Sequence, residues 1–383
     1  MTSPPVRGSW PLAKFLAASI FIALAAAGPA CGGGSAPAGQ CPVIAKGYES
    51  PAATSNWDTV RSRFGLLETR AGLGLTDNLN EWRPEFEGAP ATTAELSRPH
   101  ITLADAAGNL YIADKEAHGV RKVSLNGVIS TVAGTNIAGD GGDGPAPATT
   151  VALDNPNGLD VHADGTFYIL DLGNAKVRKV TPDGTLTTLF AIPTGLPIGR
   201  GLWVADDESE ALVAAADRVK QWRPADGVRD FASGFIELGM VLRVAPGRVL
   251  IADRGGNRVF EARGEGDCMT VVPIAGNGRP GATAPESLAT ETAFYEPRAI
   301  WPEPTGGLFV GTHQGSQVLF VDSAGRAHLF LDGGNGDFGG DGLAYDTPGR
   351  KVSELRSLAL NALGDLVITE SDEGRVRVVH ALP

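Results

Sequence analysis

Short apolar runs recur along most of the chain, and each ends at an acidic residue or a close substitute. The run GTFYILD at residues 165–171 is followed by a Gly/Asn/Ala loop and then by AKVRKV, a second short run of alternating charge. Similar runs are GNLYIAD (108–114), GRVLIAD (247–253), GGLFVGT (306–312) and GDLVITE (364–370), with a weaker copy, EALVAAAD, at 210–217. Such runs, bounded by turn residues, are typical of β-strands. An upstream apolar run precedes each copy and some copies add a further run, which predicts four short antiparallel strands per unit.

Six such units predict an all-β fold, a six-bladed β-propeller of four-stranded antiparallel blades. A solenoid would tolerate the unequal spacing of the units less well, and a two-sheet sandwich would not need near-copies. The 51 glycines and 26 prolines imply many turns, which favours short strands over long helices. The copies YIADKEAHGVRKV, YILDLGNAKVRKV and LIADRGGNRVFEA resemble the NHL repeat family, as do PNGLDV and STVAGTNIAGDGGDGPA. The resemblance covers about residues 65–380 and implies a propeller of the bacterial secreted or lipoprotein type.

The ends of the chain predict how the ring closes. The last unit, RSLALNALGDLVITESDEGRVRVVHALP, stops after three strands, whereas LLETRAG at residues 66–72 has the form of a fourth strand, as comparison with VISTVAG shows. We therefore expect the strand at about 66–72 to complete the last blade and remove exposed sheet edges. The propeller would then occupy residues 58–383.

The N-terminal region predicts export from a bacterial cytoplasm. Arg7 and Lys14 precede or flank an apolar stretch, residues 15–27, of signal-peptide length, so residues 1–30 are interpreted as a signal peptide. Small residues before Cys31 and a Gly/Ser run after it resemble a lipoprotein processing site, although Gly28 stands where Leu is usual; secretion without lipid is the alternative. Residues 31–57 are expected to form a flexible tether, which places the protein in the periplasm or on the outer membrane, held to a membrane only by the lipid. Whether Cys41 and Cys268 form a disulfide stays open.

The start of each inner strand defines a second set of positions, at the mouth of the central channel. They lie fourteen residues before the closing position, or by alignment in the longer third unit, and are His100, Asn157, Arg200, Gly239, Arg298 and Arg356. Three arginines at one aperture are notable in a chain of formal charge -12, which itself argues against a nucleic-acid partner. Guanidinium groups bind carboxylates and phosphates bidentately. The mouth is therefore a candidate anion site.

A structural explanation of the same residues competes with the binding explanation. The strand-closing acids Asp114, Asp171, Asp217, Asp253 and Glu370 are expected on the same face, where they would cap turns or neutralise the arginines. In the fifth unit Thr312 replaces the acid and His313 follows it, so Arg298 lacks an acid from its own blade. Arg298 is thus the leading candidate for a free ligand-binding group, with His313 beside it.

Long inserts are expected to wall this face. Residues 73–97, 135–155, 277–296 and 333–353 are long links between blades, whereas the links near 191–198 and 232–238 are short. Because the long links join consecutive blades, they predict a horseshoe-shaped wall around the mouth. Loops on a rigid scaffold are where binding usually occurs.

Enzyme and metal chemistry are weaker alternatives. Related six-bladed propellers include zinc lyases and calcium-dependent lactonases, but only His100 among six histidines falls at the mouth, and a cationic ring suits Ca²⁺ poorly. The inserts GDGGDG and GDFGGDG lack the spacing of a calcium loop, and neither a G-x-S-x-G elbow nor a Walker loop is present. No cofactor is therefore assigned, with calcium and zinc as the alternatives.

Taken together, these patterns favour an extracytoplasmic binding or scaffold propeller. Its ligand on the upper face would be an anionic small molecule, a glycan, a peptide or a protein partner, contacted by His100, Asn157, Arg200, Arg298, Arg356 and His313. The alternatives are a metal-dependent lyase or hydrolase with its site in the channel, and a purely structural envelope protein whose flat faces bind other proteins.

Overall fold

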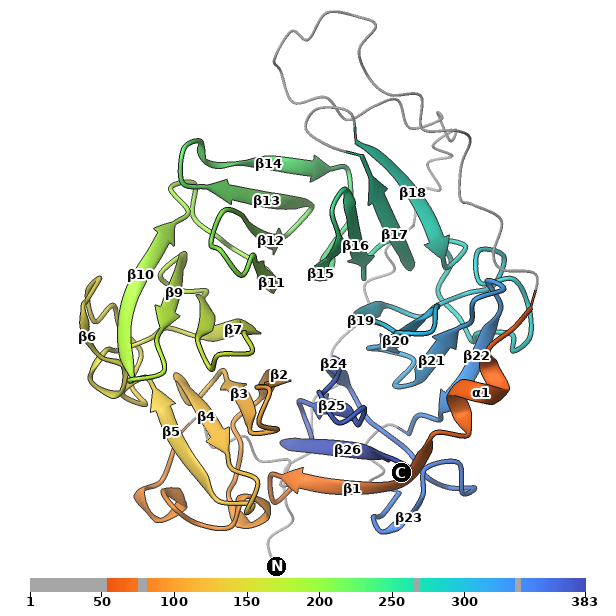
Figure 1. Cartoon of the computed structure of the whole chain (residues 1–383), viewed down its shortest axis with the longest axis horizontal. Coiled ribbons are helices and arrows are strands. Elements are labelled where there is room, and N and C mark those ends of the chain that lie inside the picture. The colour runs from red at the N-terminus through yellow and green to blue at the C-terminus, as the bar shows by residue number, and fades with distance from the viewer. Residues whose placement is uncertain (1–53, 75–80, 265–268, 335–338) are drawn as a thin grey trace, which may run out of the picture.

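The strands of the computed structural model form a closed ring (Figure 1). The structure describes residues 54–74, 81–264, 269–334 and 339–383. Within these residues the strands make six antiparallel sheets arranged as the blades of a propeller, which confirms the predicted fold. The predicted signal peptide, Cys31, Cys41, Cys268 and most of the predicted tether lie outside the described residues. No described helix has the length and apolar character needed to cross a membrane.

The first three blades follow the sequence order from the inner to the outer strand. Blade 1 consists of β2 (Pro99–Ala104), β3 (Leu110–Asp114), β4 (Gly119–Val123) and β5 (Ile129–Ala133). Blade 2 consists of β7 (Pro156–Val161), β8 (Phe167–Asp171), β9 (Lys176–Val180) and β10 (Thr185–Ala191). Blade 3 consists of β11 (Gly199–Val204), β12 (Ala211–Ala215), β13 (Arg218–Arg223) and β14 (Gly227–Ser233).

The last three blades repeat this order until the ring closes. Blade 4 consists of β15 (Leu238–Ala245), β16 (Arg248–Asp253), β17 (Arg258–Arg263) and β18 (Thr270–Ala275). Blade 5 consists of β19 (Pro297–Pro302), β20 (Leu308–Thr312), β21 (Val318–Val321) and β22 (Ala327–Leu331). Blade 6 consists of β24 (Leu355–Leu360), β25 (Leu366–Glu370), β26 (Arg375–Ala381) and the N-terminal β1 (Phe64–Ala71).

The N-terminal strand completes the last blade as predicted. β1 pairs antiparallel with β26, with Leu67 opposite Val379 and Thr69 opposite Arg377. The short helix α1 (Trp57–Arg61) precedes β1 and packs on blade 5, where the Trp57 ring stacks on His328 at 4.7 Å. The N-terminal part of the described chain is therefore held by both blade 5 and blade 6.

Apolar side chains fill the spaces between neighbouring blades. One buried cluster joins Tyr168 and Leu170 of blade 2 to Leu202 and Val213 of blade 3, and the other clusters bridge adjacent blades in the same way. Because each sheet is buried on both faces, strands such as β8 show an unbroken apolar run rather than an alternating one. This explains why the second strand of each unit is the most recognisable part of the repeat.

In their described residues, the long inserts follow the outer edges of the blades and form no wall above the mouth, contrary to the prediction. β6 (Ala146–Pro147) and β23 (Leu343–Ala344) each pair with the outermost strand of the following blade, and single bridges at Pro90 and Leu288 do the same in two other inserts. The inserts also contain the short 3₁₀ helices η1 (Pro84–Phe86), η2 (Ala91–Thr93) and η3 (Ala148–Thr150). These segments lie at the circumference of the ring (Figure 1), where they cover edges of blades 1, 2, 5 and 6.

Candidate functional site

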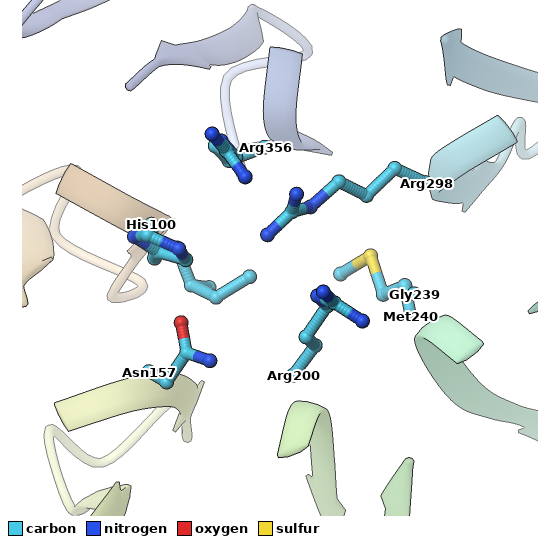
Figure 2. Close-up of a pocket in the computed structure, with 8 residues that line it drawn as sticks. His100, Asn157, Arg200, Gly239, Met240, Arg298 and Arg356 are labelled. Carbon is cyan, nitrogen blue, oxygen red and sulfur yellow. The ribbon is translucent and has the colours of Figure 1, made fainter. Parts of the chain in front are cut away.

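The inner strands bring the predicted mouth residues together around one cavity. Its lining consists of His100, Ile101, Asn157, Arg200, Gly239, Met240, Arg298 and Arg356. The cavity encloses about 200 Å³ of space between the atoms, part of it open to solvent. Figure 2 shows the Arg298 guanidinium reaching toward the centre of this ring of side chains. His313 is the one predicted site residue that does not line the cavity; its ring bonds instead to Glu296.

A β-bulge in each inner strand aims the mouth residue at the channel. The pairing of β2 with β3 shifts between Pro99 and Thr102, which places His100 within the irregularity. Arg298 lies in the corresponding shift of β19, between Pro297 and Ala299. A bulge bends its strand and redirects a side chain, and proline is tolerated there. The prolines that precede His100, Asn157 and Arg298 are therefore a sequence signal for these bulges.

Two lining residues were missed by the sequence reasoning because they are apolar. Met240 and Ile101 each follow a mouth position directly and contribute a hydrophobic wall to the cavity. Gly239, in contrast, is required by packing: a Cβ there would lie 2.4 Å from the carbonyl oxygen of Arg298. The glycine thus lets β15 and β19 approach each other, and Met240 supplies the side chain on this side of the mouth.

Four of the five strand-closing acids cap turns, as one explanation predicted, but they do not neutralise the mouth; the fifth, Asp217, pairs with Arg218. Asp114 accepts a hydrogen bond from the backbone N–H of Ser97 at 2.6 Å, and Asp171 and Glu370 accept equivalent bonds in blades 2 and 6. Asp114 also receives the Nε–H of the fully buried Arg121 at 3.0 Å. These acids therefore fix the loops that lead into the inner strands, and the predicted neutralising belt is wrong for them.

Other acids pair with the arginines instead. Glu237 contacts Arg200 at 2.5 Å and Arg254 at 2.6 Å, and Arg254 continues to Glu296 at 2.7 Å. On the next side of the mouth, Arg356 lies 3.1 Å from Glu354 and 3.3 Å from Asp372. The sequence signal was the repeated Glu-x-Arg at 296–298 and 354–356. This motif alone does not predict the ion pairs, because it does not reveal that Glu296 and Glu354 have positive φ angles of 55° and 41°.

Arg298 stands apart from this network. Its side chain is buried, with the residue 3% exposed, and it makes no ion pair with any described residue. Its Nη1 also lacks a hydrogen-bond partner there. Burial lowers the pKa of Arg298 well below its ordinary value, and the charges of Arg356 and Arg200 lower it further. The predicted absence of an acid beside Arg298 is thus found in the structure, because Glu296 pairs with Arg254 and His313.

The histidines near Arg298 are neutral. His313 donates its Nδ1–H to Glu296 at 3.0 Å, yet burial and the positive charges of Arg298 and Arg356 lower its pKa to about 2. His100 donates Nδ1–H to the carbonyl of Arg98 at 2.9 Å, and burial followed by the same two arginines places its pKa well below the ordinary value. The Nε2 atom of His100 is consequently an acceptor with a free lone pair.

Asn157 presents a second acceptor. Its side-chain NH₂ donates to the carbonyl of Gly199 on the neighbouring blade, whereas its Oδ1 is buried without a partner among the described residues. Figure 2 shows this oxygen directed toward the cavity. The mouth therefore combines an unpaired cation with unpaired acceptors.

The Gly/Asp inserts bind basic side chains. Asp140 of GDGGDG contacts Arg178 and Lys176 at 2.7 Å each, and Asp341 of GDFGGDG contacts Arg377 at 2.9 Å. Their carboxylates anchor the inserts to the blades, which is a structural role for the motifs considered as calcium sites. In the described part of the chain, no group of three or more His, Cys, Asp or Glu side chains is arranged to hold a metal ion.

Comparison with known sequences gives distant, partial matches. No family model matches the chain. Protein SUPPRESSOR OF QUENCHING 1 of Arabidopsis thaliana is 26% identical over 283 residues, which are 62% of this chain and 26% of that protein. Teneurin-4 of Mus musculus is 32% identical over 135 residues, 30% of this chain and 5% of that protein. The chain thus spans about a quarter or less of the length of these relatives.

Solved structures share the propeller fold. Auxiliary nutrient binding proteins from Bacteroides thetaiotaomicron and Bacteroides ovatus match with TM-scores of 0.61 and 0.60, each at 12% identity. The matches cover 83% and 84% of this chain and 76% and 78% of those proteins. An inactive virginiamycin B lyase from Staphylococcus aureus matches with a TM-score of 0.51 at 11% identity, over 82% of this chain and 99% of the lyase. At these identities the likeness establishes a common fold.

Proposed function

We propose that the chain is a binding propeller that captures an anionic group at the mouth of its central channel. The observation that carries this proposal is the buried Arg298 side chain, which has no acidic partner among the described residues. Moving a charge from water into a protein interior costs several kcal/mol when nothing compensates it. A carboxylate or phosphate group bound in the cavity would compensate the Arg298 charge and accept its free N–H.

The proposed setting is outside the cytoplasm. The signal-peptide and lipidation patterns around Cys31 support an exported, membrane-tethered protein, and the repeats support the NHL type of propeller. The shared fold with proteins described as auxiliary nutrient binding proteins supports a binding role for such a module. The partner is then a small molecule, or the acidic end of a glycan or peptide.

No observation favours the metal-dependent alternative. Arg200, Arg298 and Arg356 face the same cavity, and their charges oppose the binding of a divalent cation. The structural likeness to a lyase rests on the fold alone. Metal analysis of protein purified without chelator tests this alternative directly: a stoichiometric divalent metal would support it.

The anion site is tested by removing two of its charges together. Arg298→Ala combined with Arg356→Ala should abolish the binding of acetate, lactate and inorganic phosphate, measured by isothermal titration calorimetry at two salt concentrations. Arg248→Ala is the control, because Arg248 is half exposed at the opposite end of β16 and pairs with Glu261. Unchanged affinity and unchanged salt dependence in the double variant would show that the mouth is not the site.

Anion binding should weaken as the pH rises through neutrality. Burial, together with hydrogen bonding and repulsion from Asp372, raises the pKa of Glu354 to about 7, against the opposing effect of Arg356. Glu354 is therefore mostly neutral at pH 6 and mostly charged at pH 8, where it lowers the positive potential of the mouth. We expect a several-fold loss of acetate affinity between these values in calorimetric titrations. Glu354→Gln should flatten this dependence, and an equally steep fall in that variant would contradict the assignment.

A further inference from the structure

Two buried polar atoms without partners among the described residues, Arg298 Nη1 and Asn157 Oδ1, belong to residues that line one cavity. His100 lines the same cavity and uses only its Nδ1 in a hydrogen bond with a described residue. Arg298 offers a charged donor, whereas Asn157 Oδ1 and His100 Nε2 offer acceptors. An anion such as acetate matches only the first. Its oxygen atoms would face the two acceptors without a hydrogen between them. The set of free atoms therefore describes a ligand with an anionic group and a hydrogen-bond donor.

The orientation of both acceptors is fixed by backbone carbonyls. If the amide of Asn157 were turned over, its oxygen would face the carbonyl oxygen of Gly199, to which its NH₂ now donates. If His100 carried its proton on Nε2, its Nδ1 lone pair would face the carbonyl oxygen of Arg98. Each alternative places two acceptors in contact. On this side the cavity therefore presents two hydrogen-bond acceptors.

The charge around the cavity decides which donor is suitable. An ammonium group would enter a mouth lined by Arg200, Arg298 and Arg356, and like charges in one site repel. A hydroxyl group donates without bringing a charge. The geometry therefore favours a hydroxyl over an amine as the donor beside the anion.

The size and walls of the cavity limit the ligand. The empty space of about 200 Å³ between its atoms includes open solvent, so the enclosed part of the cavity is small. Ile101 and Met240 supply a small apolar surface suited to a short carbon skeleton. The cavity accordingly admits the polar end of an acid, and the rest of a larger ligand would extend outward through the mouth.

We propose that the mouth is selective for hydroxycarboxylates, in which a hydroxyl group stands next to the carboxylate. This inference rests on the proposed function and specifies its ligand class: Arg298 binds the carboxylate, and the hydroxyl donates its one hydrogen to Asn157 Oδ1, with His100 Nε2 as the neighbouring acceptor. A buried acceptor left unpaired carries a desolvation penalty, so the analogue without the hydroxyl should bind about 5- to 100-fold more weakly.

Two matched pairs of acids test the selectivity on the wild-type protein. Lactate and propionate differ only in the hydroxyl, as do mandelate and phenylacetate, and alanine replaces the hydroxyl with an ammonium group. Isothermal titration calorimetry should show lactate and mandelate preferred over their partners by at least about fivefold, and alanine binding no better than propionate. Equal affinity within both pairs would overturn the inference and leave the anion site standing. If no acid of either kind binds, the proposed function fails as well.

Asn157→Ala tests which residue reads the hydroxyl. The variant should lose the preference for lactate, so that the ratio of its lactate and propionate affinities falls to about one, while circular dichroism confirms the fold. An unaltered preference for lactate in Asn157→Ala would overturn the role of Asn157. Inorganic phosphate binding more tightly than lactate, or alanine matching lactate, would overturn the hydroxycarboxylate class. The wild-type comparison decides the inference even if the variant does not fold.

Discussion

Arg298→Met is expected to stabilise the unliganded propeller by about 1–4 kcal/mol and to abolish anion binding. Arg298 is buried and has no ion pair with a described residue, so the folded state bears the cost of its charge without compensation. Methionine has a similar length, fills the same space and carries no charge. Urea denaturation at pH 7 measures the gain in the free energy of unfolding, and calorimetry with lactate or acetate measures the loss of binding.

Arg356→Met is the matched control and should shift stability in the opposite direction. Arg356 contacts Glu354 and Asp372, so its removal leaves two partly buried carboxylates without their cation. Breaking a paired site in this way destabilises a protein. A loss of stability in both variants would show that Arg298 contributes to the fold through contacts. The proposal of a cation kept for ligand binding would then be wrong.

If Arg298→Met raises the stability of the protein and Arg356→Met lowers it, Arg298 is a residue that reduces stability in order to bind a ligand. Most proteins tolerate substitutions that raise stability, and functional sites are where such substitutions reduce activity. Two arginines that face the same cavity would then serve different purposes, one in the fold and one in binding. The sequence indicated this distinction only through Thr312, which replaces the strand-closing acid in the blade of Arg298, because both arginines follow a glutamate by two positions.

The fold could be predicted because its signals are local and repeated. The second strand of each blade is buried on both sides, so runs such as residues 167–171 are apolar throughout and end at a capping acid. The fixed length of the inner hairpin explains why counting back from that acid located the mouth residues. The predicted closing strand at 66–72 begins two residues earlier in the structure, at Phe64.

The positions of the inserts and the ion pairs of the mouth could not be predicted, because they depend on contacts between segments far apart in the sequence. The inserts bind the outer strands of the next blades through pairs such as Leu186 with Ala146, and no local pattern encodes that pairing. The sequence did not reveal the acids of the mouth either, because their ion pairs join neighbouring blades. Glu296, for example, pairs with Arg254 of the preceding blade. Such pairings follow from the closed ring and appear only when neighbouring blades are placed side by side.

Leu67→Ala should weaken the closure of the ring, with a loss of about 2–5 kcal/mol in the free energy of unfolding. Leu67 lies in β1, is fully buried, and stands opposite Val379 of β26. The truncation removes buried apolar contacts and leaves a cavity in the strand that joins the two ends of the chain. Urea denaturation measures the total loss, and amide hydrogen exchange locates it.

The preceding residue provides a control on the same strand. Leu66 is 44% exposed, so Leu66→Ala should change stability by less than about 1 kcal/mol. In Leu67→Ala the amides of β1 and β26 should lose protection before those of β8 in blade 2, because local opening follows the weakened contact. Uniform loss of protection around the ring would contradict closure at this seam and indicate that the blades unfold only together. Equal destabilisation by both variants would show that burial along β1 does not determine its contribution.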